Sequence, residues 1–222
     1  MVYGAGFQSG GAPVKESLLQ AFVTLFVVID PIGQIPTFVA LTRTHSEEER
    51  RRIALRGVLI AAVVLFAFAF AGDWLLRALG ISMAALKVAG GALLFLLAMD
   101  MVFALETGIR TATGAEKQEA EQRRDISVFP LAIPLIAGPG AFTSVALLMG
   151  RYRDDTSMVA AVLAVLAVVL ALSLLSLLLA TRAQKLLGIT GANVIGRVLG
   201  ILLSALAVQF VLDGLREAGL FA

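Results

Sequence analysis

The 222-residue sequence has no cysteine and a single histidine, His45. The lack of cysteine excludes disulfides, thiolate metal ligands and a cysteine nucleophile, and one histidine cannot make a histidine-rich metal site. Charged residues make up only 15%, whereas 59% of the residues are hydrophobic, more than the roughly 45–50% of soluble domains. The mean hydropathy is +0.92. We therefore predict an all-α polytopic membrane protein without a metal site or a cofactor.

Sequence motifs of several other functional classes are also missing. The net charge of +2 comes without a basic stripe that alternates with aromatic residues, so nucleic acid is not an expected partner. A GxxxxGK[ST] motif is absent, which argues against ATP as the energy source of this chain. Neither HExxH nor GxSxG occurs, and we expect no enzymatic activity.

Six apolar stretches are long enough to cross the hydrocarbon core of a membrane, which takes about 20 residues of helix. They cover residues 16–42, 56–76, 81–105, 126–149, 157–181 and 190–214. The segments between them, such as THSEEERRR and TRAQKLLGIT, are predicted loops because of their charges and turn residues. The Gly-rich residues 1–15 are predicted to be a flexible tail, and residues 16–218 a single transmembrane domain.

Lysine and arginine are divided unequally between the two sides of the predicted spans. The first, third and fifth loops contain eleven, namely Arg43, Arg50, Arg51, Arg52, Arg56, Arg110, Lys117, Arg123, Arg124, Arg182 and Lys185. The other side has five, namely Lys15, Arg77, Arg151, Arg153 and Arg216. The positive-inside rule then makes these three loops cytoplasmic. We predict a multi-pass protein of the plasma (inner) membrane with both termini on the non-cytoplasmic side.

The two halves of the sequence resemble each other. The first and fourth predicted spans both contain Pro-x-x-x-x-Pro, as PIGQIP and PLIAGP. GISMAALKVAGGALLFL in the third span matches GITGANVIGRVLGILLS in the sixth, which pairs Lys87 with Arg197. Repeats of three spans are necessarily antiparallel in the bilayer. The sequence therefore predicts two inverted three-helix repeats, 16–105 and 126–218, joined by the loop 106–125.

The stretch VVIDPIGQIPTF, residues 27–38, places Asp30, two prolines and a glycine inside an apolar span. Proline removes a backbone N–H and clashes with the preceding turn, and irregular backbone persists in a membrane only where protein covers it or water reaches it. We predict that spans one and four are broken at mid-membrane, near 30–36 and 134–140, and that a binding site lies where the breaks meet. The alternatives are plain proline kinks and, for Asp30, a helix N-cap.

Such a site suits a small zwitterion, with its carboxylate at the helix N-termini and its ammonium on Asp30. In span six, Asn193, Arg197, Gly200 and Ser204 share one helical face, and Arg197 is assigned to the substrate path unless it snorkels to the cytoplasmic surface. The predicted substrate-binding residues are Asp30, Pro31, Gly33, Gln34, Pro36, Pro134, Gly138, Pro139, Gly140, Thr143, Ser144, Asn193 and Arg197.

Three segments resemble the MarC family of integral membrane proteins, within the LysE-type transporter superfamily. They are LFVVIDPIGQIP followed by FVALT, then FPLAIPLIAGPGAFTS, and the Asn193, Arg197, Gly200 series leading into AVQFVLDG. The resemblance, from about residue 16 to 218, implies a secondary transporter of small neutral amino acids such as glycine and alanine.

We expect the transporter to be coupled to a proton or cation gradient and to act in export. A metal or other cation exporter of the same superfamily is the alternative, and a lipid-handling or structural membrane protein is a further one. The expected partners are a small neutral amino acid, a coupling proton or cation and the lipid bilayer. Homo-oligomerisation is left open.

Overall fold

The protein is described here from a computed structural model, which describes residues 14–103 and 126–220, without the side chains of 183–190, 192 and 193. All regular structure in this part of the chain is helical. In chain order the elements are α1 (Val14–Ile29), α2 (Gln34–Leu41), α3 (Glu47–Ala78), α4 (Met83–Phe103), η1 (Ser127–Ile136), α6 (Pro139–Arg151), α7 (Thr156–Leu178) and α8 (Ala180–Glu217). The predicted loop 106–125 lies outside the described residues, as does the predicted tail apart from residues 14 and 15, which begin α1.

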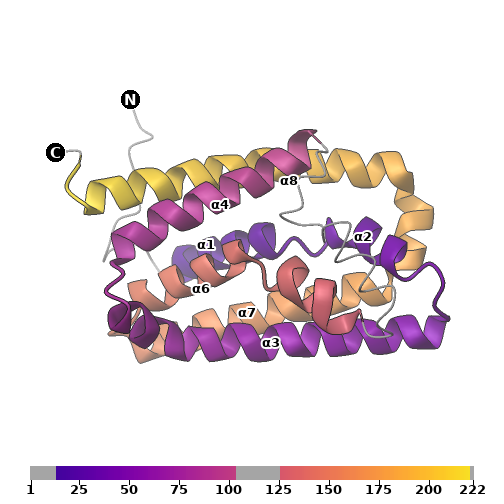
Figure 1. Ribbon diagram of the computed structural model, residues 1–222, viewed down its shortest axis with the longest axis horizontal. Coiled ribbons are helices and arrows are strands. Elements are labelled where there is room, and N and C mark those ends of the chain that lie inside the picture. The colour runs from indigo at the N-terminus through magenta and orange to yellow at the C-terminus, as the bar shows by residue number, and fades with distance from the viewer. Residues whose placement is uncertain (1–13, 104–125, 221–222) are drawn as a thin grey trace.

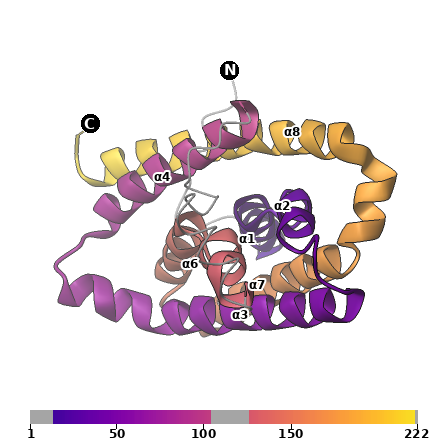
Figure 2. The ribbon, with the colours of Figure 1, turned by 45° about the vertical axis from the view of Figure 1, so that its right-hand side comes forward.

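The helices form three layers (Figure 2). Helices α4 and α8 form one outer layer, α3 and α7 form the other, and α1, α2, η1 and α6 lie between them. Five segments of the described chain are long and apolar enough to span a membrane, and η1 with α6 forms a sixth, bent by 55°. The chain is therefore an all-α polytopic membrane protein, as predicted, with its two irregular spans in the middle.

Several helices extend beyond their apolar spans. Helix α3 begins at Glu47, well before the predicted span, because Ser46 and Glu49 form a capping box: Ser46 Oγ accepts from the Glu49 N–H at 3.3 Å, and the Ser46 N–H donates to Glu49 Oε2 at 2.8 Å. These hydrogen bonds from Ser46 lower the pKa of Glu49 below its ordinary value. The predicted loop TRAQKLLGIT is wrong, since α8 begins at Ala180 and runs through it. Hydropathy marks the apolar part of a helix, and polar residues prolong it outside the membrane.

The two halves of the chain are related as inverted repeats. Helix α1 and η1 start at opposite ends of the bundle, so the broken spans run in opposite directions (Figure 1). Helices α1 and α2 contact α7, just as η1 and α6 contact α3 in the other half. Likewise α1 and α2 contact α8, as α6 contacts α4. This exchange of equivalent neighbours is the pattern that a two-fold axis between the repeats produces.

Helices α4 and α8, the third spans of the two repeats, pack closely and antiparallel. A Cβ atom at Gly91 would lie 2.7 Å from the Ala207 carbonyl oxygen, and one at Gly214 would lie 2.8 Å from that of Ala84. Small residues thus allow the two backbones to approach. At one end of the pair, Lys87 of α4 donates to Glu217 of α8.

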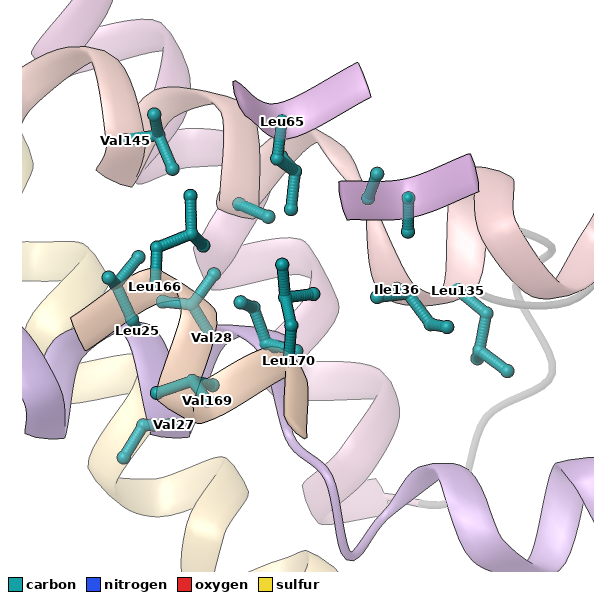
Figure 3. Close-up of a cluster of buried hydrophobic side chains, with 14 of the residues drawn as sticks. Leu25, Val27, Val28, Leu65, Leu135, Ile136, Val145, Leu166, Val169 and Leu170 are labelled. Carbon is teal, nitrogen blue, oxygen red and sulfur yellow. The ribbon is translucent and has the colours of Figure 1, made fainter. Parts of the chain in front are cut away.

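The core fills the space around the middle layer. Figure 3 shows Leu25 and Val28 of α1 beside Leu166 and Leu170 of α7, with Leu65 of α3 nearby. All five side chains are buried. The inner faces of the middle-layer helices are therefore packed against protein, whereas Val128 and Ile133 of η1 are exposed.

Candidate functional site

The break in span one is a turn built around Asp30. Helix α1 ends at Ile29, and Asp30 follows in the left-handed region at φ 52°, where aspartate is among the few non-glycine residues found. Its carboxylate Oδ1 accepts from the Gly33 N–H at 2.9 Å, and its carbonyl accepts from the Gln34 N–H at 3.3 Å. The Asp30 side chain is completely buried. Asp30 thus caps the start of α2, and its charge lies inside the protein.

Gly33 and Gln34 complete this turn. A Cβ atom at Gly33 would lie 1.9 Å from Asp30 Oδ2, so the carboxylate occupies the space that any other side chain would need. Gln34 is fully buried, and its Nε2 donates to the Ile29 carbonyl, which the end of α1 has freed. Among the described residues Gln34 Oε1 has no hydrogen-bond partner. The break therefore contains a buried carboxylate and a buried, unsatisfied acceptor.

The break in span four lies between η1 and α6. Within η1, Phe129 and Ile133 have extended backbone, with φ −131° at both. Helix α6 begins at Pro139, directly after the extended Gly138, so proline occupies the first helical position, where its missing N–H is harmless. Both spans are thus interrupted within the predicted ranges 30–36 and 134–140.

A small pocket lies at the break of span four and is lined from span one by Val28 of α1. Its lining consists of Val28, Leu93, Leu97, Pro134, Leu135, Gly138, Pro139, Gly140 and Ala141. A Cβ atom at Gly140 would lie 3.1 Å from Val28 Cγ1, which shows how closely the end of α1 approaches the start of α6. The pocket has a volume of about 20 Å³, enough for about one water molecule.

The start of α6 adjoins this pocket, but most of its backbone donors are already used or missing. The Gly138 carbonyl accepts from the N–H groups of Ala141 at 3.0 Å and Phe142 at 3.2 Å, while Pro139 has no N–H. Gly140 is buried against Leu94, whose Cδ2 would lie 2.2 Å from a Cβ atom there. The N-terminal turn of a helix carries partial positive charge and suits an anionic group. The pocket therefore combines apolar walls with the positive end of α6.

Thr143 and Ser144 lie one turn further along α6 and are both buried. Thr143 Oγ1 donates to the Pro139 carbonyl at 3.0 Å, and its methyl group fills the space above Gly90 of α4. Ser144 Oγ has no hydrogen-bond partner among the described residues, and neither has Ser173 Oγ on α7. Together with Gln34, these hydroxyls leave unpaired polar atoms in the middle of the bundle, where each one is costly.

The structure separates the span-six residues from this site. The Arg197 side chain is exposed and does not line the pocket, and its neighbours Val194 and Val198 are more than half exposed. The side chain of Asn193 lies outside the described residues. Of the predicted residues, Pro134, Gly138, Pro139 and Gly140 line the pocket, whereas those of the span-one break do not, and Arg197 lies on the outer face of α8.

Sequence reasoning missed several residues of the site. Leu93 and Leu97 line the pocket from α4, at a spacing of one helical turn. In the sequence they are indistinguishable from the leucines that face lipid. Ser173 is one of two serines in the run LALSLLSLLL, and the sequence does not tell which of the two is buried in the structure.

Comparison with known proteins identifies the chain. The model of the family described as "MarC family integral membrane protein" matches residues 15–219. The chain belongs to the MarC family. It is 41% identical over 200 residues to a UPF0056 membrane protein of Archaeoglobus fulgidus, covering 89% of this chain and 91% of that protein.

Two relatives come from Escherichia coli. The UPF0056 membrane protein YhcE is 34% identical over 195 residues, covering 88% of this chain and 90% of its own length. The protein named UPF0056 inner membrane protein YhgN is 33% identical over 202 residues, covering 90% of this chain and 97% of its own length. No solved structure matches significantly. The family match covers both broken spans, so the site described above lies within the part shared with other MarC proteins.

Proposed function

We propose that this MarC protein is a secondary transporter of small neutral amino acids. One observation carries the proposal: two broken spans from inverted repeats lie together in the middle layer, and the pocket at the break of span four is also lined by Val28 of span one. Discontinuous helices at the interface of inverted repeats are the way in which many transporters build a substrate site. Half-helices that meet only at such a site can also move separately. Such movement would let the site open to one side of the membrane at a time, which alternating access requires.

The chemistry of the two breaks suits the two ends of an amino acid. The N-terminal turn of α6 attracts a carboxylate, because the helix dipole presents positive charge there. The carboxylate of Asp30 and the unsatisfied Oε1 of Gln34 attract an ammonium group. Both acceptors are fully buried, so a bound cationic group would be shielded from competing water.

The walls of the pocket limit the size of the substrate side chain. Gly138, Gly140 and Ala141 contribute little or no side chain, and the remaining lining is apolar. The pocket is small, with a volume of about 20 Å³, so we expect α6 to move when a substrate binds. Glycine and alanine are the substrates that need the least displacement.

We further propose that a proton or cation gradient drives the transport, that the direction is export, and that the protein lies in the plasma membrane with both termini outside. Within this scheme Asp30 is the residue that alternates between the substrate ammonium and the coupling ion. Its position at the hinge between α1 and α2 would couple its charge state to the position of α2.

The proposal is tested by flux in reconstituted vesicles. Purified protein in liposomes should move [14C]-glycine and [14C]-alanine when a pH or sodium gradient is imposed, and unlabelled small amino acids should compete better than leucine or phenylalanine. Protein-free liposomes are the control. Absence of flux with both substrates, under gradients of either direction and either ion, would refute the assignment.

A further inference from the structure

Three bonds from one arginine tie the cytoplasmic-loop end of α2 to the other repeat. Arg50, on the first turn of α3, donates through Nε to the Thr42 carbonyl at 2.9 Å and through NH2 to the Arg43 carbonyl at 3.3 Å. Its NH1 donates to Thr181 Oγ1 at 3.3 Å, across a sequence separation of 131 residues. The guanidinium thus joins the C-terminal end of the half-helix α2 to the corner between α7 and α8.

A second arginine makes the corresponding connection at the opposite end of the bundle (Figure 1). Arg153, in the turn after the half-helix α6, pairs with Asp73 on the last turns of α3, with NH1 3.5 Å from Oδ2. Arg77 Nε holds the other oxygen of Asp73 at 3.3 Å, which orients the carboxylate. The end of α6 is further tied to α1 by Arg151, which donates to Gln20 Oε1 at 3.4 Å.

These two clusters are equivalent under the repeat. In each, an arginine after the half-helix of a broken span reaches the region where the second and third spans of the other repeat meet: Thr181 in the first turn of α8 in one case, and Asp73 on the last turns of α3 in the other. Each half-helix has a break of the site at one end and an arginine cluster at the other. A shift of α6, which lines the pocket, therefore has to pull on the Arg153–Asp73 cluster, and a shift of α2, which follows the Asp30 turn, has to pull on the Arg50 cluster.

We propose that the Arg50 cluster and the Arg153–Asp73 cluster are two latches that close opposite ends of the transport path and open in alternation. This inference rests on the proposed transport function. Both latches are closed in the structure, and the pocket has a volume of only about 20 Å³. Opening the Arg50 latch would free α2 and connect the site to the side of the α2–α3 loop, and opening the Arg153 latch would free α6 toward the other side.

Cysteine accessibility tests the latches without reference to any substrate. The natural chain has no cysteine, and Ala141 lines the pocket with 2% exposure, so Ala141→Cys is a single, buried reporter. Its reaction with a small charged methanethiosulfonate is measured from each side, in right-side-out and inside-out vesicles. We expect Arg50→Ala to raise the rate at least about tenfold from the α2–α3 loop side only, the factor that losing one hydrogen bond to a charged group gives.

Arg153→Ala should raise the rate from the opposite side only. Arg52→Ala and Arg216→Ala are the matched controls, since both remove an exposed arginine near the same ends and should leave the rate unchanged. Thr181→Val removes only the hydroxyl of the first latch, so it should raise the rate from the same side as Arg50→Ala, but more weakly. It replaces Arg50→Ala in the test if Arg50→Ala folds poorly.

The outcomes separate the latches from the transport proposal. Unchanged rates in all three latch variants, or equal increases from both sides, would overturn the latches, because the clusters would then be passive or the bundle merely loosened. If the cysteine modification rate rises from one side only, but the protein moves no amino acid, the latches are supported and the proposed substrates are refuted.

Discussion

Replacing Asp30 with asparagine separates the capping role of this residue from its charge. The structure shows the cap directly, with Oδ1 accepting from the Gly33 N–H at 2.9 Å. Asparagine has an oxygen at the same position and tolerates the left-handed backbone found here at φ 52°. It cannot carry the negative charge or bind a proton. If the charge holds the substrate ammonium or the coupling ion, Asp30→Asn should fold normally and lose gradient-driven flux.

The magnitudes follow from these contacts. Removing an N-cap acceptor costs about 1 kcal/mol, and alanine in the left-handed region costs a further ~1–2 kcal/mol. Asp30→Ala should therefore destabilise the protein by about 2–3 kcal/mol, whereas Asp30→Asn should cost less than ~1 kcal/mol. Losing a charge-assisted hydrogen bond to the ammonium should lower flux about 10- to 100-fold in both variants.

The assay combines thermal unfolding in detergent with [14C]-glycine flux in vesicles under an imposed pH gradient. Asp213→Asn is the matched control, because Asp213 is an acid near the end of α8 that accepts from Gln209 Nε2 at 2.8 Å and lies away from the breaks. Flux in Asp30→Asn equal to that of the natural protein would show that the residue is only a cap, and would leave the helix ends as the whole site.

Three further outcomes are expected. Gly140→Ala should lower the unfolding free energy by about 1–3 kcal/mol through overpacking, measured by thermal unfolding, because its Cβ would lie 2.2 Å from Leu94 Cδ2; adding Leu94→Ala should restore part of the loss, and no rescue would contradict the contact. Gln34→Leu should cost about 1–3 kcal/mol in the same assay, because the carbonyl at the end of α1 loses its donor inside the bundle. Single cysteines at Thr44 and Asp154, in the exposed turns at opposite ends of the bundle, should react with an impermeant maleimide from the cytoplasmic and the outer side respectively; the reverse pattern would invert the predicted topology.

Local chemistry determined much of this protein in advance. Long apolar runs specify membrane helices, because about 20 consecutive apolar residues are needed to cross the hydrocarbon core. This requirement is local and does not depend on the rest of the chain. Proline and glycine act on their own backbone, so the breaks after Ile29 and before Pro139 were readable from the sequence. The matching prolines also indicated the inverted repeat, since each half carries its own copy of the signal.

Only the tertiary structure decided which of these residues act together. The pairing of Arg50 with Thr181 joins residues 131 positions apart, and no periodicity or motif encodes such a contact. The same holds for Leu97, which lines the pocket and is buried while its neighbour Leu96 is exposed, and for Arg197, which shares a helical face with small residues yet lies on the outside of α8. In a membrane, apolar residues suit both lipid and protein, so hydrophobicity does not tell the inner face of a helix from the outer one; packing between helices makes that choice.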